Sequence, residues 1–214
     1  MYTPEHFIET DLATLHQAMV DWPLGALIVA GAAGLQANHV PFELDPSKGT
    51  LGTLRCHVAR MNDVWRSPNT ECLVIFQGPS AYVSPNLYES KKEHGKVVPT
   101  YNYFAVHAHG RLAIHDDARW LRGLVGRLTR RFEANQIEPW KMGDAPQAYI
   151  DELLPQIVGI EIEIARLEGK WKMSQNRPEA DRAGVVAGLR NSPKPAEREV
   201  AAIVAERSAR ISDS

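Results

Sequence analysis

The chain has 214 residues, 44% of them hydrophobic, which is enough for one sizeable domain with a full core. Its 24 basic and 26 acidic residues give a formal charge of −2, which argues against a globally basic nucleic-acid-binding protein. The first residues, MYTPEHFIETD, lack the basic and apolar regions of a signal peptide, and no apolar run reaches the length of a membrane span. We therefore expect a cytoplasmic protein.

The first half of the chain predicts one helix followed by short strands. Thr10 or Asp11 can cap a helix that continues to about Val20. Strands are predicted where apolar or alternating runs are bounded by turn residues, at 25–30, 35–44, 50–58 and 70–77, with a short extended piece at 81–84. The turn between the first two strands spans Gly31 to Gly34.

A fifth strand is predicted at 101–114, where aromatic side chains alternate with small or branched ones. Tyr101, Tyr103, Ala105, His107 and His109 share one face, because successive side chains in a strand point to opposite sides. We expect Gly110 to interrupt this strand near its end. The face suits either a planar polar ligand or an ordinary aromatic core, and the lysine-rich loop 90–96 precedes it.

The second half predicts helices around one more strand. An amphipathic helix begins at Asp116 or Asp117 and ends near Phe132. A short helix at 145–154 precedes a sixth strand at 157–167, and the polar segment 169–178 is predicted to be irregular. Helices at 178–189 and 196–207 flank a Pro-containing linker at 191–195.

Six strands separated mostly by turns, with helices inserted late, predict a β-rich α+β protein with a six-stranded antiparallel barrel and peripheral helices. We expect one domain at 1–190 and a linker with a helical tail at 191–214. The chain has no GxGxxG after a strand and no GxxxxGK[ST], so Rossmann and P-loop nucleotide sites are not expected.

Polar residues gather at the ends of consecutive predicted strands. His39, His57, Arg60 and Asn62 would present hydrogen-bond donors and one planar guanidinium suited to a phosphate. The alternative is an ordinary polar strand end at the surface.

Two further stretches carry candidate ligand contacts. His107 and His109 share a strand face and could hold one metal ion with help from His39 or His57, although structural histidines are the simpler explanation. The segment 168–178 combines two lysines, an arginine and Trp171, which suits either a ring and a phosphate or a solvated loop.

A modest basic stripe lies opposite the apolar face of the predicted 117–132 helix. It consists of Arg119, Arg122, Arg127 and Arg130, and it could contact DNA phosphates or form a solvated helix face. The chain shows no helix-turn-helix pattern and no Ser/His/Asp or Cys/His arrangement, so catalytic residues stay unassigned.

Several long motifs resemble the PaiB family of FMN-binding negative transcriptional regulators. They are MYTPEHF at the start, ANHVPF at 37–42, LRCHVARMN at 54–62, VIFQGPSAYVSP at 74–85, HGKVVPTYNYFAVHAHGRL at 94–112 and VGIEIEIARLEGKWKMSQNRP at 158–178. The resemblance extends from the N-terminus to about Leu189 and leaves the tail uncovered. Tyr101 stands where many members have Trp.

The resemblance implies an FMN-binding split barrel, a fold shared with pyridoxamine-phosphate-oxidase-like flavoproteins, which are usually homodimers with flavin at the interface. By position, residues implied to hold the flavin phosphate are Asn38, His39, Val40, His57, Val58, Ala59, Arg60 and Asn62. Further implied flavin contacts are Gln77, Tyr101, Asn102, Lys170, Lys172, Ser174 and Gln175. The implied function is transcriptional repression as a dimer, and the alternative is a flavin-dependent oxidoreductase acting on a small molecule.

Overall fold

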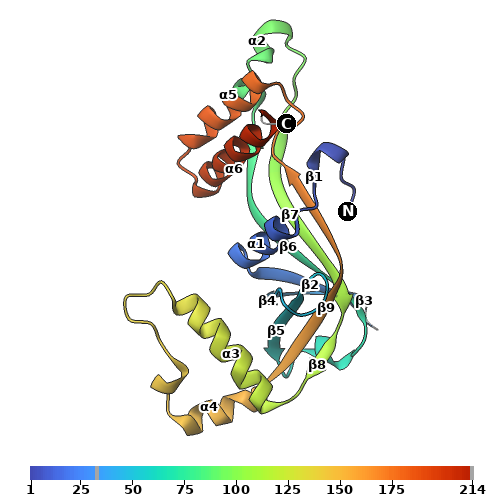
Figure 1. Cartoon of the computed structure of the whole chain (residues 1–214), viewed down its shortest axis with the longest axis vertical. Coiled ribbons are helices and arrows are strands. Elements are labelled where there is room, and N and C mark those ends of the chain that lie inside the picture. The colour runs from blue at the N-terminus through green and yellow to red at the C-terminus, as the bar shows by residue number, and fades with distance from the viewer. Residues whose placement is uncertain (32–33, 213–214) are drawn as a thin grey trace. The chain divides into compact units, whose positions relative to one another are not determined.

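The structure is a computed structural model that describes residues 1–31 and 34–212 (Figure 1). Its α-helices are α1 (Leu12–Asp21), α2 (Ser90–His94), α3 (Ala118–Glu133), α4 (Gln147–Leu153), α5 (Glu179–Arg190) and α6 (Pro195–Ser212). Its strands are β1 (Ile8–Glu9), β2 (Leu24–Gly31), β3 (Gly34–Pro41), β4 (Glu43–Asp45), β5 (Thr53–Ala59), β6 (Glu71–Val83), β7 (Thr100–Arg111), β8 (Ala113–His115) and β9 (Ile157–Lys172). Its 3₁₀ helices are η1 (Glu5–Phe7), η2 (Asp63–Arg66), η3 (Pro85–Leu87), η4 (Met142–Asp144) and η5 (Leu154–Gln156).

The nine strands that the described residues form have the order β3-β2-β6-β7-β9-β5-β4, with β1 and β8 also paired to β9. Antiparallel ladders join β2 to β3 and β6, β5 to β4 and β9, and β9 to β1 and β8. The prediction of an α+β protein built on antiparallel strands is confirmed. The predicted number of six strands is wrong.

Three predicted boundaries fail because the strands are longer than the local sequence indicates. β6 continues through Pro79 to Val83 and joins the predicted 70–77 strand to the 81–84 piece, since its side chains keep alternating between buried and more exposed positions. β7 passes through Gly110 and ends at Arg111. β9 continues to Lys172, so the first part of the segment predicted to be irregular is a strand.

Other predicted segments are divided or extended. The predicted strand 35–44 becomes β3 and β4, which Phe42 separates, and 101–114 becomes β7 and β8, which Leu112 separates. The loop 90–96 contains the short helix α2, which ends at His94 and is capped by Gly95 with φ of 67°. The last helix is longer than predicted and begins at Pro195. The predicted Gly31–Gly34 turn includes residues 32 and 33, which lie outside the described residues.

The chain divides into two compact units, to which β6, β7 and β9 each contribute residues. Unit 1 contains Met1–Leu15, Gln77–Val106 and Glu168–Ser214, and unit 2 contains His16–Phe76 and His107–Leu167. Neither unit contributes a membrane helix: across the residues described, every helix is too short or too polar to cross a bilayer.

Unit 2 has a core of β-sheet side chains, and α3 adds one apolar face. Strands β5 and β9 bury their inward residues completely, as Leu54, Ile160 and Ile162 show with 0% exposure. Asp117 caps α3 by accepting a 2.7 Å hydrogen bond from the backbone N of Trp120. Leu121 of α3 packs with residues of α4 and η5. The predicted amphipathic helix is therefore confirmed.

Unit 1 has a core in which α5 and α6 lie side by side (Figure 1). Val185 of α5 and Val200 and Val204 of α6 are fully buried. Asp181 of α5 accepts hydrogen bonds from the backbone N and the hydroxyl of Ser90, at 2.9 and 2.7 Å. These bonds attach the start of α2 to α5 and fix the segment that leads toward β7.

Candidate functional site

The predicted strand-end residues of unit 2 lie on β3 and β5 and in the turn that follows β5. Asn62 Nδ2 donates to Asn38 Oδ1 at 2.7 Å, and Asn62 Oδ1 accepts from the backbone N of Val64 at 3.0 Å. Asn62 thus ties β3 to the end of β5 while it caps η2. The other members lie on the same strands: Val58 is buried, Val40 is half-buried, and His39 and Ala59 are exposed.

His57 is the member of this group with an unmet hydrogen-bonding need. It lies on β5 opposite Gly159 of β9, and its Nδ1 is buried with no hydrogen-bond partner among the described residues. Burial lowers the pKa of His57, so the imidazole is neutral at pH 7. A buried polar atom without a partner is rare in native proteins, so this nitrogen is a candidate ligand contact.

Most N–H groups of the Arg60 guanidinium already donate hydrogen bonds to other residues of the protein. Its Nε donates to the Pro155 carbonyl at 2.5 Å, its two Nη atoms hold both carboxylate oxygens of Asp116, and Nη2 also donates to the Ile157 carbonyl at 3.3 Å. These bonds use four of the five N–H groups of the guanidinium. One N–H remains, so Arg60 can give a phosphate only a single bond while this arrangement persists.

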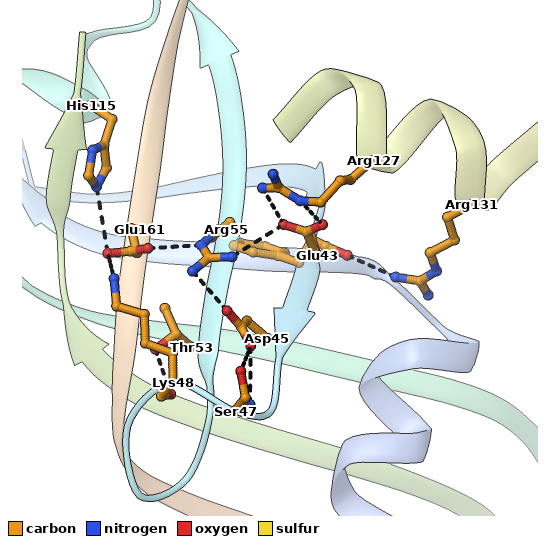
Figure 2. A network of polar contacts seen from close by, with 11 residues as sticks. Glu43, Asp45, Ser47, Lys48, Thr53, Arg55, His115, Arg127, Arg131 and Glu161 are labelled. Carbon is orange, nitrogen blue, oxygen red and sulfur yellow. Dashed lines mark hydrogen bonds and ion pairs between the residues drawn. The ribbon is translucent and has the colours of Figure 1, made fainter. Parts of the chain in front are cut away.

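An ionic network that was not predicted from the sequence surrounds Arg55 in unit 2 (Figure 2). Arg55 Nε donates to Glu161 at 2.8 Å, and its Nη2 lies 2.9 Å from Asp45. Glu43 approaches Nη1 at 3.7 Å, and the Arg55 side chain is only 15% exposed. Knowledge of the strand register would have revealed this network, because the register places Arg55 opposite both Glu43 and Glu161.

Further cations complete this network, which is drawn in Figure 2. Lys48 Nζ binds Glu161 at 2.6 Å, and Arg127 binds Glu43 through Nε and Nη2 at 2.6 and 2.9 Å. Burial raises the pKa of Glu161, but hydrogen bonds from Lys48 and Arg55 outweigh it and keep the pKa below its ordinary value. Glu43, Asp45 and Glu161 pair with the three cations Lys48, Arg55 and Arg127, and these ion pairs stabilise unit 2. Arg131, also drawn in Figure 2, donates to the Phe42 carbonyl instead.

The predicted residues of unit 1 form a separate polar group. Asn102 and Ser174 are buried and bond each other, with Nδ2 of Asn102 donating to Ser174 Oγ at 2.9 Å. Lys172 donates to the Thr100 hydroxyl and, at 2.7 Å, to the carbonyl of Tyr101. Gln175 accepts from the backbone N of Met173 at 2.7 Å and donates to the Trp171 carbonyl at 2.6 Å, which closes the turn after β9.

The indole of Trp171 is a core side chain and offers no face to a ligand. It is 5% exposed, stacks on Phe104 at 4.8 Å between ring centroids, and has the Arg207 guanidinium 5.2 Å from its ring. For Trp171 the structure therefore contradicts both alternatives, an indole against a ligand ring and a residue of a solvated loop. Gln77 and Tyr101 are exposed, and Tyr101 makes an edge contact with Tyr82. Their assignment as flavin contacts stays a prediction.

The predicted histidine face occurs on β7, with 6.5 Å between the ring centroids of His107 and His109. Arg166 Nη2 lies 3.1 Å from His109 Nδ1, which must accept because a guanidinium has no lone pair to offer. While this contact persists, Nδ1 of His109 is not available to a metal ion.

His109 also lines a cavity of about 480 Å³ in unit 2, a volume within the range of small-molecule pockets. Its lining residues are Glu71, Cys72, His109, Gly110, Arg111, Glu163, Ala165 and Arg166. Burial raises the pKa of Cys72 to about 12, so the residue is a thiol at neutral pH and a poor nucleophile. The cavity is large enough for a small molecule, but its cysteine is not activated as a nucleophile for covalent catalysis.

The four arginines predicted for DNA differ in their surroundings on α3. Arg122 pairs with Asp151, and Arg127 pairs with Glu43. Arg119 and Arg130 are exposed, and no carboxylate in the described ranges lies within ion-pair distance of either. Only this second pair therefore keeps an uncompensated charge for an anionic partner.

The chain is similar in sequence to proteins of fungi and bacteria. An uncharacterized protein of Emericella nidulans is 37% identical over 97% of this chain and 97% of its own length. The protease synthase and sporulation protein PAI 2 of Bacillus subtilis is 26% identical over 97% of this chain and 98% of its own length.

Solved flavoprotein structures share the fold at low sequence identity. The flavocytochrome Anf3 from Azotobacter vinelandii matches with a TM-score of 0.58 and 10% identity, covering 77% of this chain and 69% of that chain. The FAD and heme binding protein from Mycobacterium smegmatis matches with a TM-score of 0.54 and 16% identity, covering 77% and 73%. A family model described as "Putative FMN-binding domain" matches residues 1–166, and the chain therefore belongs to that family.

Proposed function

We propose that this protein is an FMN-binding protein of the split-barrel type. Its flavin contacts include the strand-end residues Asn38, His39, Val40, His57, Val58, Ala59, Arg60 and Asn62. The family match supports the proposal because it covers all of these residues. The observation that carries it is the buried Nδ1 of His57, which has no partner among the described residues. A ligand that bonds this nitrogen would remove an unfavourable buried polar group.

The residues present fit a flavin in part. His57, Asn38 and Asn62 offer neutral hydrogen-bonding groups suited to the amide and hydroxyl groups of FMN, while Arg60 spares one N–H. In this proposal His57 binds the flavin, and the bond between Arg60 and Asp116 holds the end of β5 against the start of α3. Bound FMN would supply reversible electron transfer, and the protein would supply binding and orientation.

His57→Ala tests this assignment. The variant loses one uncharged hydrogen bond, worth about 0.5–1.5 kcal/mol, so FMN should bind about 2–10-fold more weakly than to the wild type. FMN fluorescence quenching measures the affinity, with His94→Ala as the matched control, because His94 is an exposed residue of unit 1. If both variants bound FMN with wild-type affinity, His57 would not be a flavin contact.

Transcriptional repression is the second candidate, and the exposed arginines Arg119 and Arg130 favour it. They are eleven residues apart on α3, which at about 100° per residue places them on the same face. The PaiB resemblance points the same way. We propose that the protein acts as a dimer, because β3 is an eight-residue strand at one end of the sheet order and open edges tend to pair. Flavin-dependent redox chemistry on a small molecule is the alternative use of the same site.

Replacing both Arg119 and Arg130 by Glu tests the DNA role. Retention of operator DNA in a mobility-shift assay should be lost, and the salt dependence of any residual binding should be flatter, because phosphate contacts release counterions. Arg66→Glu is the control, since Arg66 is an exposed arginine outside α3. Undiminished retention by the Arg119/Arg130 variant would exclude this face.

A further inference from the structure

Three cations of unit 1 lie together without a compensating carboxylate. Lys170 and Lys172 occupy the same face of β9, two residues apart, and Arg177 follows in the next turn. Across the described residues, no carboxylate lies within ion-pair distance of any of the three. The nearby acidic groups of unit 1 serve other partners: Glu168 pairs with the N-terminal amine, and Glu9 pairs with Arg207 at 2.5 Å.

The turn after β9 brings Arg177 back beside Lys172. Ser174 adopts a left-handed backbone conformation with φ of 65°, which is uncommon for a residue other than glycine. Its carbonyl accepts a 2.9 Å hydrogen bond from the backbone N of Arg177. The Arg177 guanidinium lies 4.7 Å from the centre of the Tyr88 ring, which fixes its position at the edge of the cluster.

A small cavity opens at Lys172 and Arg177. Its volume is about 90 Å³, and its lining residues are Phe7, Tyr88, Thr100, Asn102, Lys172, Ser174, Asn176 and Arg177. Since one water occupies about 30 Å³ of liquid volume, the space accepts a group about the size of three waters. Pockets for drug-sized ligands begin near 300 Å³, so this one takes a small ionic group and no flavin ring.

The electrostatics of the cavity favour an anion. Burial lowers the pKa of Lys172, and the positive charges of Lys170 and Arg177 lower it further. Among the described residues no carboxylate lies within ion-pair distance of Lys172, so no acidic group offsets these positive charges. Two half-buried cations lining one cavity repel each other unless an anion enters between them.

We propose that this cavity is an oxyanion site, in which Lys172 and Arg177 bind a phosphate-class anion and the hydroxyl and amide groups of Thr100, Asn102 and Ser174 complete its coordination. The anion is either free in solution or the phosphate group of FMN. Charge-assisted hydrogen bonds from ammonium and guanidinium groups suit both sources. The proposal stands whether or not flavin occupies the strand-end residues of unit 2, and all three cations follow residue 166, where the family match ends.

Thermal unfolding of the full-length chain at constant ionic strength tests the site, with inorganic phosphate exchanged for chloride. Phosphate should raise Tm of the wild type in a saturable manner, because an anion that binds only the folded state stabilises it by mass action. Lys172→Met and Arg177→Met should each reduce this phosphate-dependent rise at least threefold. Lys92→Met should retain it, since Lys92 is exposed on α2 and pairs with Glu89.

Each variant is compared with itself, as the difference between its Tm in phosphate and its Tm in chloride. A general loss of stability in Lys172→Met or Arg177→Met therefore does not count as a loss of phosphate binding. A wild-type Tm that is the same in phosphate as in chloride, or a phosphate-dependent rise that survives in both Lys172→Met and Arg177→Met, would overturn the proposal. Competition then identifies the source of the anion. If FMN displaces phosphate and riboflavin does not, the cavity holds the flavin's phosphate. If neither displaces phosphate while the variants still lose the rise, the site serves a free anion, and this result leaves flavin binding in unit 2 unaffected.

Discussion

Arg55→Met should lower the free energy of unfolding by about 2–3 kcal/mol at pH 7. Removing one partner of a buried ion pair costs about 3–5 kcal/mol, and the figure here is smaller because the Arg55 and Glu161 side chains are 15% and 11% exposed. Methionine keeps most of the apolar stem, so the loss reports the missing charge and its hydrogen bonds. Chemical denaturation followed by circular dichroism measures it.

The dependence of this loss on pH follows from the carboxylates. Hydrogen bonds from Ser47 outweigh burial and, with help from Arg55, keep the pKa of Asp45 below its ordinary value, and the pKa of Glu161 is lowered as well. Groups with lowered folded pKa values stabilise the fold above their unfolded pKa of about 4 and lose that contribution as the pH falls through the folded pKa. The difference between wild type and Arg55→Met should therefore shrink below about pH 4.

Arg66→Met is the control, because Arg66 pairs with Asp63 at 3.2 Å with both side chains more than half exposed. Exposed pairs of this kind contribute about 0–1 kcal/mol. Similar midpoints for the two variants at pH 7 would show that the Arg55 network does not hold unit 2 together.

Gly110→Ala should also be strongly destabilising, by about 2–3 kcal/mol. A Cβ at Gly110 would lie 2.5 Å from the carbonyl oxygen of Glu163 and 2.6 Å from Cγ2 of Ile162. The first contact is with backbone of β9, so no side-chain rotation relieves it and the strands must separate. The measurement is the denaturation midpoint of the full chain.

Gly143→Ala supplies the matched control for that change. Gly143 lies in η4, and a Cβ there has no heavy atom of the described chain within 4 Å. Its substitution should change the midpoint little. If Gly110→Ala unfolded at the wild-type midpoint, the close approach of Gly110 to β9 would not be required for the fold.

The sequence predicted elements whose pattern is local. α3 has a capping Asp117 and an apolar stripe, and the structure buries Leu121, Leu124 and Leu128 as that pattern requires. The alternation of β7 likewise predicted that Tyr101 and Tyr103 share one face, and the structure buries Asn102 and Phe104 on the opposite face. In both cases the burial of a residue depends on a periodicity that is legible in a window of about ten residues.

The residues at which strands end, and the partners of charged side chains, could not be predicted from such a local pattern. β9 continues through Gly169 to Trp171 because neighbouring strands supply hydrogen bonds and Phe104 supplies a stacking partner, and both come from distant parts of the chain. Arg60 and its partner Asp116 are 56 positions apart in the chain, and Arg55 and Glu161 are 106 positions apart. The pair of Arg55 and Glu161 follows from the register between β5 and β9, which composition and spacing do not specify.

Titration of the flavin-free chain with FMN, followed by quenching of flavin fluorescence and by the visible spectrum of the flavin, tests whether this chain binds FMN. We expect saturable binding with one flavin site per chain, a spectral shift of the bound flavin, and weaker FMN binding by His57→Ala. Fluorescence and a flavin spectrum that stay unchanged in the presence of correctly folded wild-type chain would contradict this expectation.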